Sequence, residues 1–253
     1  TLMDVMNIVE SLFRWLHVVA GITWIGLLYF FNWVNSAFTP TMDAETKQKV
    51  VPELLPRTLY WFRWGAAFTW FSGIFLLAIV YYHSKMAFDG GIADWNAPVI
   101  VMVILTFAGV HVYDLIYKKV KNPQVGFALG VIGSAVMLCA YQNWAGFSFR
   151  GYAIHLGAFF GTCMAFNVWF RIWPAQQKII TAIKNGEKPD ADLAALAGLR
   201  SKHNTYMSIP LVFLMISQHA TWAASWVHLS AIVLVGWLVC YWLYNKSKTV
   251  PGF

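Results

Sequence analysis

Four histidines of this chain fall at matching positions in long apolar segments. His17 opens the first such segment, His155 opens the fifth, His219 closes the sixth and His228 opens the seventh. Because successive segments cross a membrane in opposite directions, the sequence predicts all four imidazoles in its outer third, whereas His111 falls in the inner half. Ionisable groups at membrane depth are costly and usually functional. Imidazoles at one depth on facing helices are what axial ligation of a b-type haem requires.

We therefore predict noncovalent haem b, in a number that the sequence leaves open, as a cofactor. His17 and His219 are the first choice as iron ligands, with His155 and His228 in reserve. Gly21 lies one helical turn after His17 and would leave room for a flat ring. The alternative is that each histidine is hydrogen-bonded to a neighbouring helix and that the glycine belongs to a helix-packing groove.

A second set of polar and aromatic residues is predicted at the inner ends of the segments. Its members are Arg57, Trp61, Arg63, Trp64, Asn167, Arg171, Arg200, His203 and Asn204. Arginine offers a planar fork of donors to an anion, and aromatic rings offer stacking faces. The mixture suits a small, flat, anionic heterocycle, and His203 is the candidate base. The alternative is that these residues are ordinary interfacial anchors.

The composition indicates that lipid is the solvent of this surface. Of 253 residues, 59% are apolar and 11% are charged, which is less than half the roughly 25% charge of a soluble domain. The basic residues fall in loops, so the net charge of +7 does not indicate a nucleic acid partner. The three cysteines are isolated and no CxxCH motif occurs, which excludes covalent c-type haem within the chain.

Apolar runs of about 20 residues cross the hydrocarbon core, and their number predicts the fold. The predicted fold is all-α, a polytopic bundle of about seven transmembrane helices in a single domain over residues 1–253. The predicted spans are 12–36, 59–82, 97–117, 124–144, 152–173, 205–222 and 226–244. The connection 174–204 is predicted as a cytoplasmic excursion with a short surface helix at 191–199.

Positive charge determines the predicted orientation, because Lys and Arg are retained on the cytoplasmic side. With the N-terminus outside and the C-terminus inside, fourteen basic residues fall inside and only Arg14, Lys85 and Arg150 fall outside. Arg63 lies where the chain enters the membrane and completes the eighteen. We expect a multi-pass protein of a bacterial inner (cytoplasmic) membrane.

Four segments resemble the membrane-bound urate oxidase (urate hydroxylase) family over nearly the whole chain. They are LHVVAGITWIGLLYFFNWVNSAF from Leu16, PRTLYWFRWGAAFTWFSGIFLL from Pro56, NVWFRIWPAQQKII from Asn167 and RSKHNTYMSIPLVFLMISQHA from Arg200. His17, with Trp24 and Gly26, is also similar to the less specific opening motif of haem-containing protoporphyrinogen oxidases.

The resemblance implies oxidation of urate to 5-hydroxyisourate, with electrons leaving outward through haem to a c-type cytochrome. Arg57, Arg171 and Arg200 would hold the urate anion and Trp61 or Trp64 would stack on it. The cytochrome c domain of the family does not follow Phe253, so we expect a lost domain or a separate cytochrome.

Two other functions compete with this one. A haem-carrying or noncatalytic membrane subunit of a respiratory electron-transfer complex would also lack a cytochrome domain. A copper transporter is disfavoured, because the methionines lack a repeated Met-x-x-Met pattern.

The charge distribution predicts that Lys118 and Lys246 are cytoplasmic and that Arg150 is outside. Cysteines substituted at these positions, treated with an impermeant thiol reagent in intact cells, should be labelled only at 150. Labelling at 118 and 246 but not at 150 would reverse the orientation.

Overall fold

The fold is all-α, as the sequence predicts. The computed structural model describes residues 2–91 and 95–252, and helices make up 86% of the protein, with no strand in the described part. The α-helices are α1 (Leu2–Tyr29), α2 (Ser36–Phe38), α3 (Ala44–Leu76), α4 (Ala97–Lys119), α5 (Pro123–Cys139), α6 (Phe149–Asn167), α7 (Trp173–Lys184), α8 (Ala191–Ile216) and α9 (Trp226–Ser247). Short π-helical segments continue several of them, namely η1 (Phe30–Asn35), η3 (Leu77–His83), η5 (Ala140–Trp144) and η6 (Val168–Ile172).

Among the described residues, six continuous helical stretches are long and apolar enough to cross a membrane. They are Val5–Thr41, Ala44–His83, Ala97–Lys119, Pro123–Trp144, Phe149–Lys184 and Trp226–Ser247. They contain the first five predicted spans and the seventh in full, and the protein is accordingly a multi-pass membrane protein.

The sixth predicted span, 205–222, differs from the helix that contains it. Helix α8 ends at Ile216, and Thr221–Ala223 form a separate 3₁₀ turn, η7. The predicted surface helix at 191–199 is no separate element, because it is the first part of α8. Arg200 and Lys202 follow within the same helix, so α8 joins a charged half to an apolar half.

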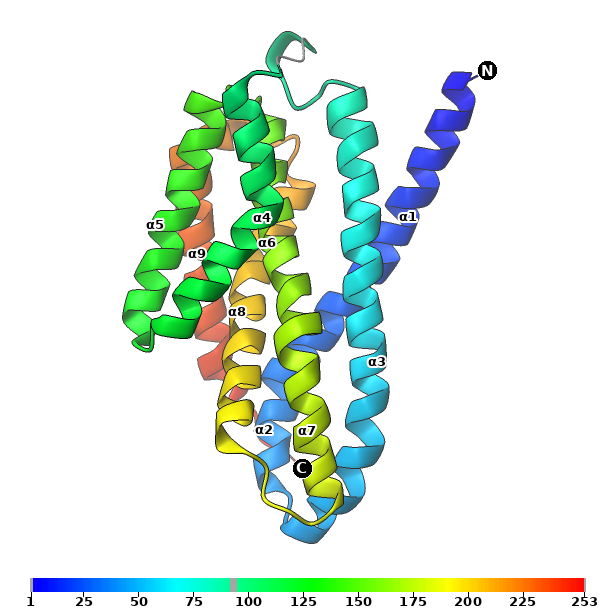
Figure 1. Cartoon of the computed structure of the whole chain (residues 1–253), viewed down its shortest axis with the longest axis vertical. Helices are drawn as coiled ribbons and strands as arrows, with labels where there is room; N and C mark the ends of the chain where they lie inside the picture. Colours follow the sequence, from blue (N-terminus) through cyan, green and yellow to red (C-terminus); the bar gives the residue numbers. More distant parts are fainter. Residues whose placement is uncertain (1, 92–94, 253) are drawn as a thin grey trace. The chain divides into compact units, whose positions relative to one another are not determined.

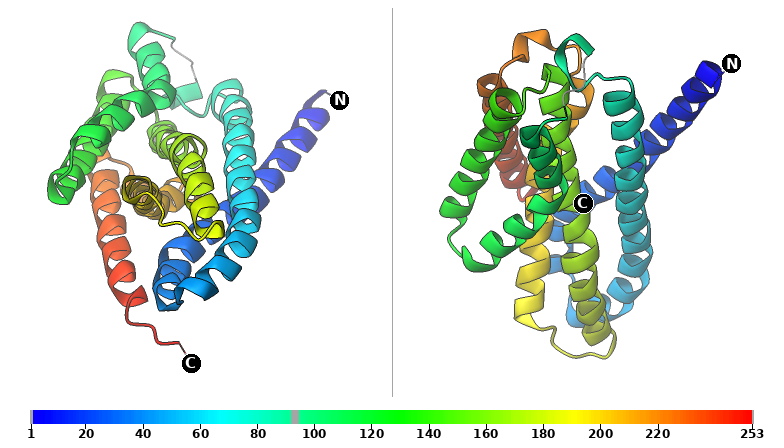
Figure 2. Two further views of the ribbon diagram at one scale, coloured as in Figure 1. Left: turned by 60° about the horizontal axis from the view of Figure 1, so that its bottom comes forward. Right: turned by 45° about the horizontal axis from the view of Figure 1, so that its top comes forward.

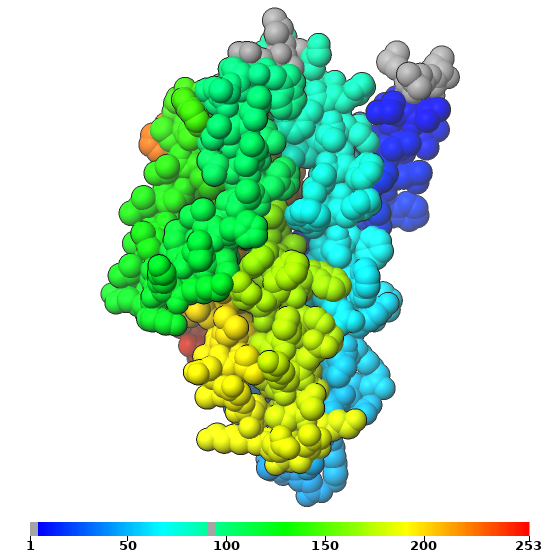
Figure 3. Space-filling model, viewed as in Figure 1, coloured from blue at the N-terminus to red at the C-terminus, as the bar shows by residue number. Residues whose placement is uncertain are grey.

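The chain forms two compact units, each assembled from three separate parts of the sequence. Unit 1 contains residues 1–13, 73–163 and 208–238, and unit 2 contains residues 14–72, 164–207 and 239–253. In unit 1, α4 and α5 form an antiparallel hairpin, which Figures 1 and 2 show in green. Figure 3 shows the surface of this hairpin, whose exposed side chains include Ile104, Leu115 and Ile132. Such apolar helix faces fit a lipid environment.

Polar side chains mark where several helices begin. Asn96 caps α4 by accepting a hydrogen bond from the Val99 amide at 3.0 Å, and Asn122 caps α5 in the same way. At the start of α3, Asp43 accepts from the Thr46 amide at 2.7 Å. This bond lowers the pKa of Asp43, so its stabilising contribution is present at neutral pH and is lost as the pH falls through the lowered pKa.

Helices α1 and α3 approach each other closely within unit 2. A Cβ atom built on Gly65 would lie 3.2 Å from the Trp24 amide nitrogen and 3.3 Å from the Ala20 carbonyl oxygen. Both neighbours are backbone atoms and cannot rotate away. One turn further along α3, Thr69 lies 3.8 Å from the Cβ position of Gly21. A glycine at 65 therefore sets the distance between the two helices.

Replacing Gly65 by Ala should destabilise the protein by about 1–3 kcal/mol, the usual cost of adding atoms to a well-packed contact. Thermal unfolding in detergent would measure this as a lower transition temperature. Gly133→Ala in α5 is the matched control, because nothing lies within 4 Å of its Cβ position. Equal transition temperatures for Gly65→Ala and the native protein would contradict the close contact.

Candidate functional site

His17 lies on α1 of unit 2 and faces α3. Its Nδ1 atom is 3.0 Å from the hydroxyl oxygen of Ser72, which is completely buried. The space beside Gly21 is bounded by Thr69 of α3, so this glycine contributes to the contact between the helices. His17 itself is half-buried.

His155 lies in unit 1 and is completely buried. Its Nδ1 atom is 2.6 Å from the Gly151 carbonyl oxygen, which can only accept, so Nδ1 carries the proton. The lone pair of Nε2 then accepts from the hydroxyl of Tyr82, and the ring stacks on Phe147 with centroids 4.4 Å apart. Both nitrogens are thus in hydrogen bonds, which favours the interpretation of His155 as a histidine bonded to its neighbouring helices.

The two remaining candidate haem ligands are exposed and lie in unit 1. His219 is in the turn after α8, and His228 is in the first turn of α9. Among the described residues, no group of three or more His, Cys, Asp or Glu side chains is placed to hold a metal ion. An axial pair of histidines is a smaller set than such a group.

All nine residues predicted for the inner cluster belong to unit 2. Asn167, Arg200 and Asn204 are completely buried. The Asn167 amide donates to the Asn204 side-chain oxygen at 2.8 Å, and the Asn204 amide donates to the Met164 carbonyl at 3.0 Å. This amide pair joins the end of α6 to α8 and brings two of the predicted stretches together.

Arg63 is surrounded by aromatic rings. Its guanidinium carbon lies 3.9 Å from the ring centroid of Trp173, 5.6 Å from that of Tyr60 and 5.9 Å from that of Trp169. The Trp169 indole also donates to the Arg63 carbonyl at 3.0 Å. The Nε and Nη1 atoms of Arg63 are buried and have no hydrogen-bond partner among the residues that the structure describes. Arg63 is therefore a partly buried cation that is stabilised mainly by its contacts with aromatic ring faces.

Trp169 and Trp173 complete this cluster, and Trp169 is the member that was not predicted from the sequence. Both follow Asn167 in the stretch NVWFRIW, and their spacing of four residues places them on one helix face. That spacing is the signal that could have identified Trp169. Trp64 joins the same group, because its ring meets that of Trp169 edge-on at 5.5 Å.

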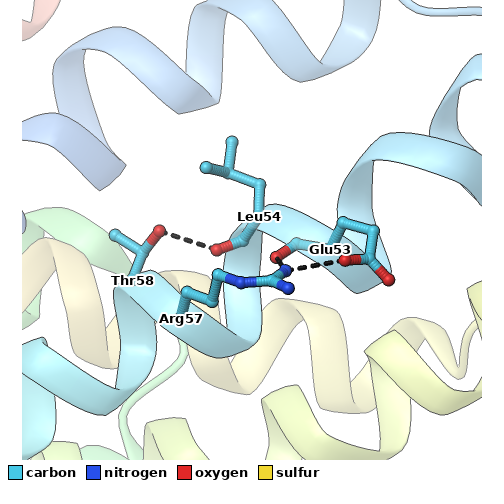
Figure 4. A network of polar contacts seen from close by, with 4 residues as sticks. All are labelled: Glu53, Leu54, Arg57 and Thr58. Carbon is cyan, nitrogen blue, oxygen red and sulfur yellow. Dashed lines mark hydrogen bonds and ion pairs between the residues drawn. The ribbon is translucent and has the colours of Figure 1, made fainter.

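Three other predicted members lie at the surface of unit 2. Arg57 is paired with the Glu53 carboxylate at 2.7 Å, and both side chains are more than 70% exposed; Figure 4 shows this pair. Trp61 is 62% exposed, and Arg171 donates to the Phe170 carbonyl at 3.0 Å. Surface ion pairs contribute little stability, about 0–1 kcal/mol. The surroundings of Arg57 and Trp61 favour the role of interfacial anchors.

His203 lies on α8, outside the six candidate spans. Burial lowers the pKa of its imidazole, and the positive charges of Arg200 and Lys202 lower it further. The ring is therefore neutral at pH 7 and can accept a proton, as a general base must.

Several of these residues lie in or beside π-helical segments. Such segments account for well under 1% of residues in ordinary proteins and often occur at functional sites. Segment η6 follows Asn167 and contains Trp169, whereas η3 and η5 carry Tyr82 and Tyr141 beside His155. The π-helical turns were not predicted from the sequence.

The fold and the inner cluster define a class, a multi-pass helical membrane protein with buried polar groups beside stacked arginine and tryptophan. Comparison with protein-family models adds a match to the family described as urate oxidase N-terminal, over residues 3–48 and 42–252. The chain belongs to this family, which confirms the resemblance found in the sequence. Neither the comparison with curated proteins nor that with solved structures gave a match.

Replacing Lys202 by Gln should raise the pKa of His203, because it removes a positive charge that disfavours the imidazolium. In an NMR titration of histidine-labelled protein in detergent, the His203 signal is the one that disappears in His203→Gln. Its titration midpoint should move to a higher pH in Lys202→Gln. Lys178→Gln on α7 is the control and should leave the midpoint in place. A lower or unchanged midpoint in Lys202→Gln would contradict the electrostatic cause.

Proposed function

We propose that this chain is the membrane domain of an oxidoreductase of a bacterial inner membrane that converts urate to 5-hydroxyisourate in purine metabolism. Electron transport would run through noncovalent b-type haem to a c-type cytochrome on a separate chain or domain. The observation that carries the proposal is the family match over nearly the whole chain.

The inner cluster of unit 2 has the chemistry that a urate anion needs. Arg63 presents a planar cation beside Trp169 and Trp173, and a flat anionic ring can combine stacking with donors from a guanidinium. Arg200 supplies a second, completely buried positive charge on α8. Charge-assisted hydrogen bonds to such an anion are worth about 1.5–3 kcal/mol each.

His203 would take the proton that urate loses. It lies one turn from Arg200 on α8, and its lowered pKa keeps the ring neutral at pH 7. A neutral imidazole next to an anion-binding arginine combines substrate binding with proton acceptance. Asn167 and Asn204 hold α6 against α8 beside it.

The haem part of the proposal depends on His17. Its Nδ1 atom is hydrogen-bonded within the protein, as is usual for a metal-ligating histidine. The hydrogen bonds of His155 fit this role less well. When bound, the haem would carry single electrons.

Replacing Arg63 by Lys keeps the charge but removes the planar fork and its stack on Trp173. In a urate-dependent assay of cytochrome c reduction, the urate concentration for half-maximal rate should rise roughly ten- to a hundredfold, since each 1.4 kcal/mol is tenfold. Haem content, read from the reduced optical spectrum, should stay unchanged. Lys49→Gln, at an exposed ion pair with Glu45, is the control.

If the urate concentration for half-maximal rate is unchanged in Arg63→Lys, Arg63 does not bind urate. If the native protein reduces none of the c-type cytochromes supplied when urate is added, the proposed enzyme activity is overturned. The alternative, a subunit of a respiratory complex, is then favoured.

A further inference from the structure

We propose that Ser72 is the positioning residue that fixes the tautomer of His17 and so presents its Nε2 atom to an iron ion. The inference rests on the proposed haem role of His17. It concerns how the Ser72 side chain determines which nitrogen of the His17 ring can bind iron.

The hydrogens around Ser72 determine the direction of its bond with His17. A serine hydroxyl has one proton. The Ser72 oxygen lies 2.6 Å from the Phe68 carbonyl oxygen and 3.1 Å from the Thr69 carbonyl oxygen, and neither carbonyl can donate. The hydroxyl proton is therefore directed at these two carbonyls of the preceding turn.

The bond between His17 and Ser72 must then run from the ring to the serine. The Ser72 oxygen has only lone pairs left for the Nδ1 atom at 3.0 Å, so Nδ1 carries the proton and donates. In a neutral imidazole the other nitrogen, Nε2, then holds a lone pair. A metal-ligating histidine commonly donates its second ring N–H to a protein acceptor in this way, which fixes both tautomer and ring orientation.

The helices that carry the two residues leave little freedom in this contact. Three contacts follow one another along the antiparallel pair: Gly65 against Trp24, Thr69 against Gly21, and Ser72 against His17. Each step is three or four residues on both helices, which is the spacing of one helix face. Because Gly65 meets backbone atoms of α1, the whole row is fixed, and the Ser72 oxygen is held within reach of Nδ1.

The tautomer can be measured without haem. Nitrogen-15 NMR of histidine-labelled, haem-free protein should assign the proton of His17 to Nδ1, with His17→Ala identifying the signal. In Ser72→Ala the proton should redistribute toward Nε2, because the acceptor is gone. A native protein with the proton on Nε2, or an unchanged distribution in Ser72→Ala, would overturn the inference.

The second measurement is haem binding. Ser72→Ala should weaken haem affinity roughly ten- to a hundredfold, the usual cost of losing such an outer hydrogen bond, and should shift the reduced optical band. Ser72→Thr keeps the hydroxyl and should retain the native haem affinity and the native position of the reduced band. Ser134→Ala is the matched control, because Ser134 is also buried and bonded to a carbonyl of its own helix, at 2.8 Å.

The outcomes separate this inference from the proposed function. A native b-type band that Ser72→Ala leaves unchanged in position and affinity overturns the role of Ser72 alone. A native protein that binds no haem overturns the haem part of the proposed function, and the role of Ser72 falls with it.

Discussion

The backbone contact between α1 and α3 at Gly65 is the constraint on which much of unit 2 depends. No side chain separates the helices there, and the opposing atoms are a backbone nitrogen and a carbonyl oxygen. The contact holds His17 opposite Ser72 two turns away along α3. It also fixes the turn of α3 that carries Arg63 and Trp64, both within two residues of the glycine. Helix packing and the candidate chemistry thus share one short stretch of α3.

A membrane interior adds a second constraint, because buried polar groups there cannot bond to water. The protein meets it with paired side chains inside each unit. Asn167 and Asn204 bond to each other in unit 2, and the hydroxyls of Thr106 and Tyr141 lie 2.7 Å apart in unit 1. The first pair ties α6 to α8, and the second ties α4 to the segment that continues α5. Such polar residues stabilise the packing of the helices. Burial of a polar residue is therefore not sufficient evidence for a functional role.

This distinction sorts the candidate residues. Both nitrogens of His155 are engaged by Gly151 and Tyr82, which accounts for its burial without a metal. His17 differs, because in the proposed tautomer it donates from Nδ1 to Ser72 and keeps a lone pair on Nε2. In the inner cluster, Arg57 has a carboxylate partner at the surface, whereas Arg63 has aromatic rings about it. Residues such as Arg63, whose surroundings are not those of a surface ion pair, are the better candidates for function.

The sequence by itself determined the all-α membrane fold, the family and the residue types available for chemistry. Apolar runs of membrane length and basic loops are local properties, so they can be read without a structure. The end of α8 at Ile216 and the π-helical turns were not predictable, because packing between helices overrides local propensity. Only the tertiary structure decided which nitrogen of His17 bonds to Ser72 and which aromatic rings enclose Arg63. Those answers depend on side chains from helices distant in sequence, and spacing along one helix carries no information about its neighbour.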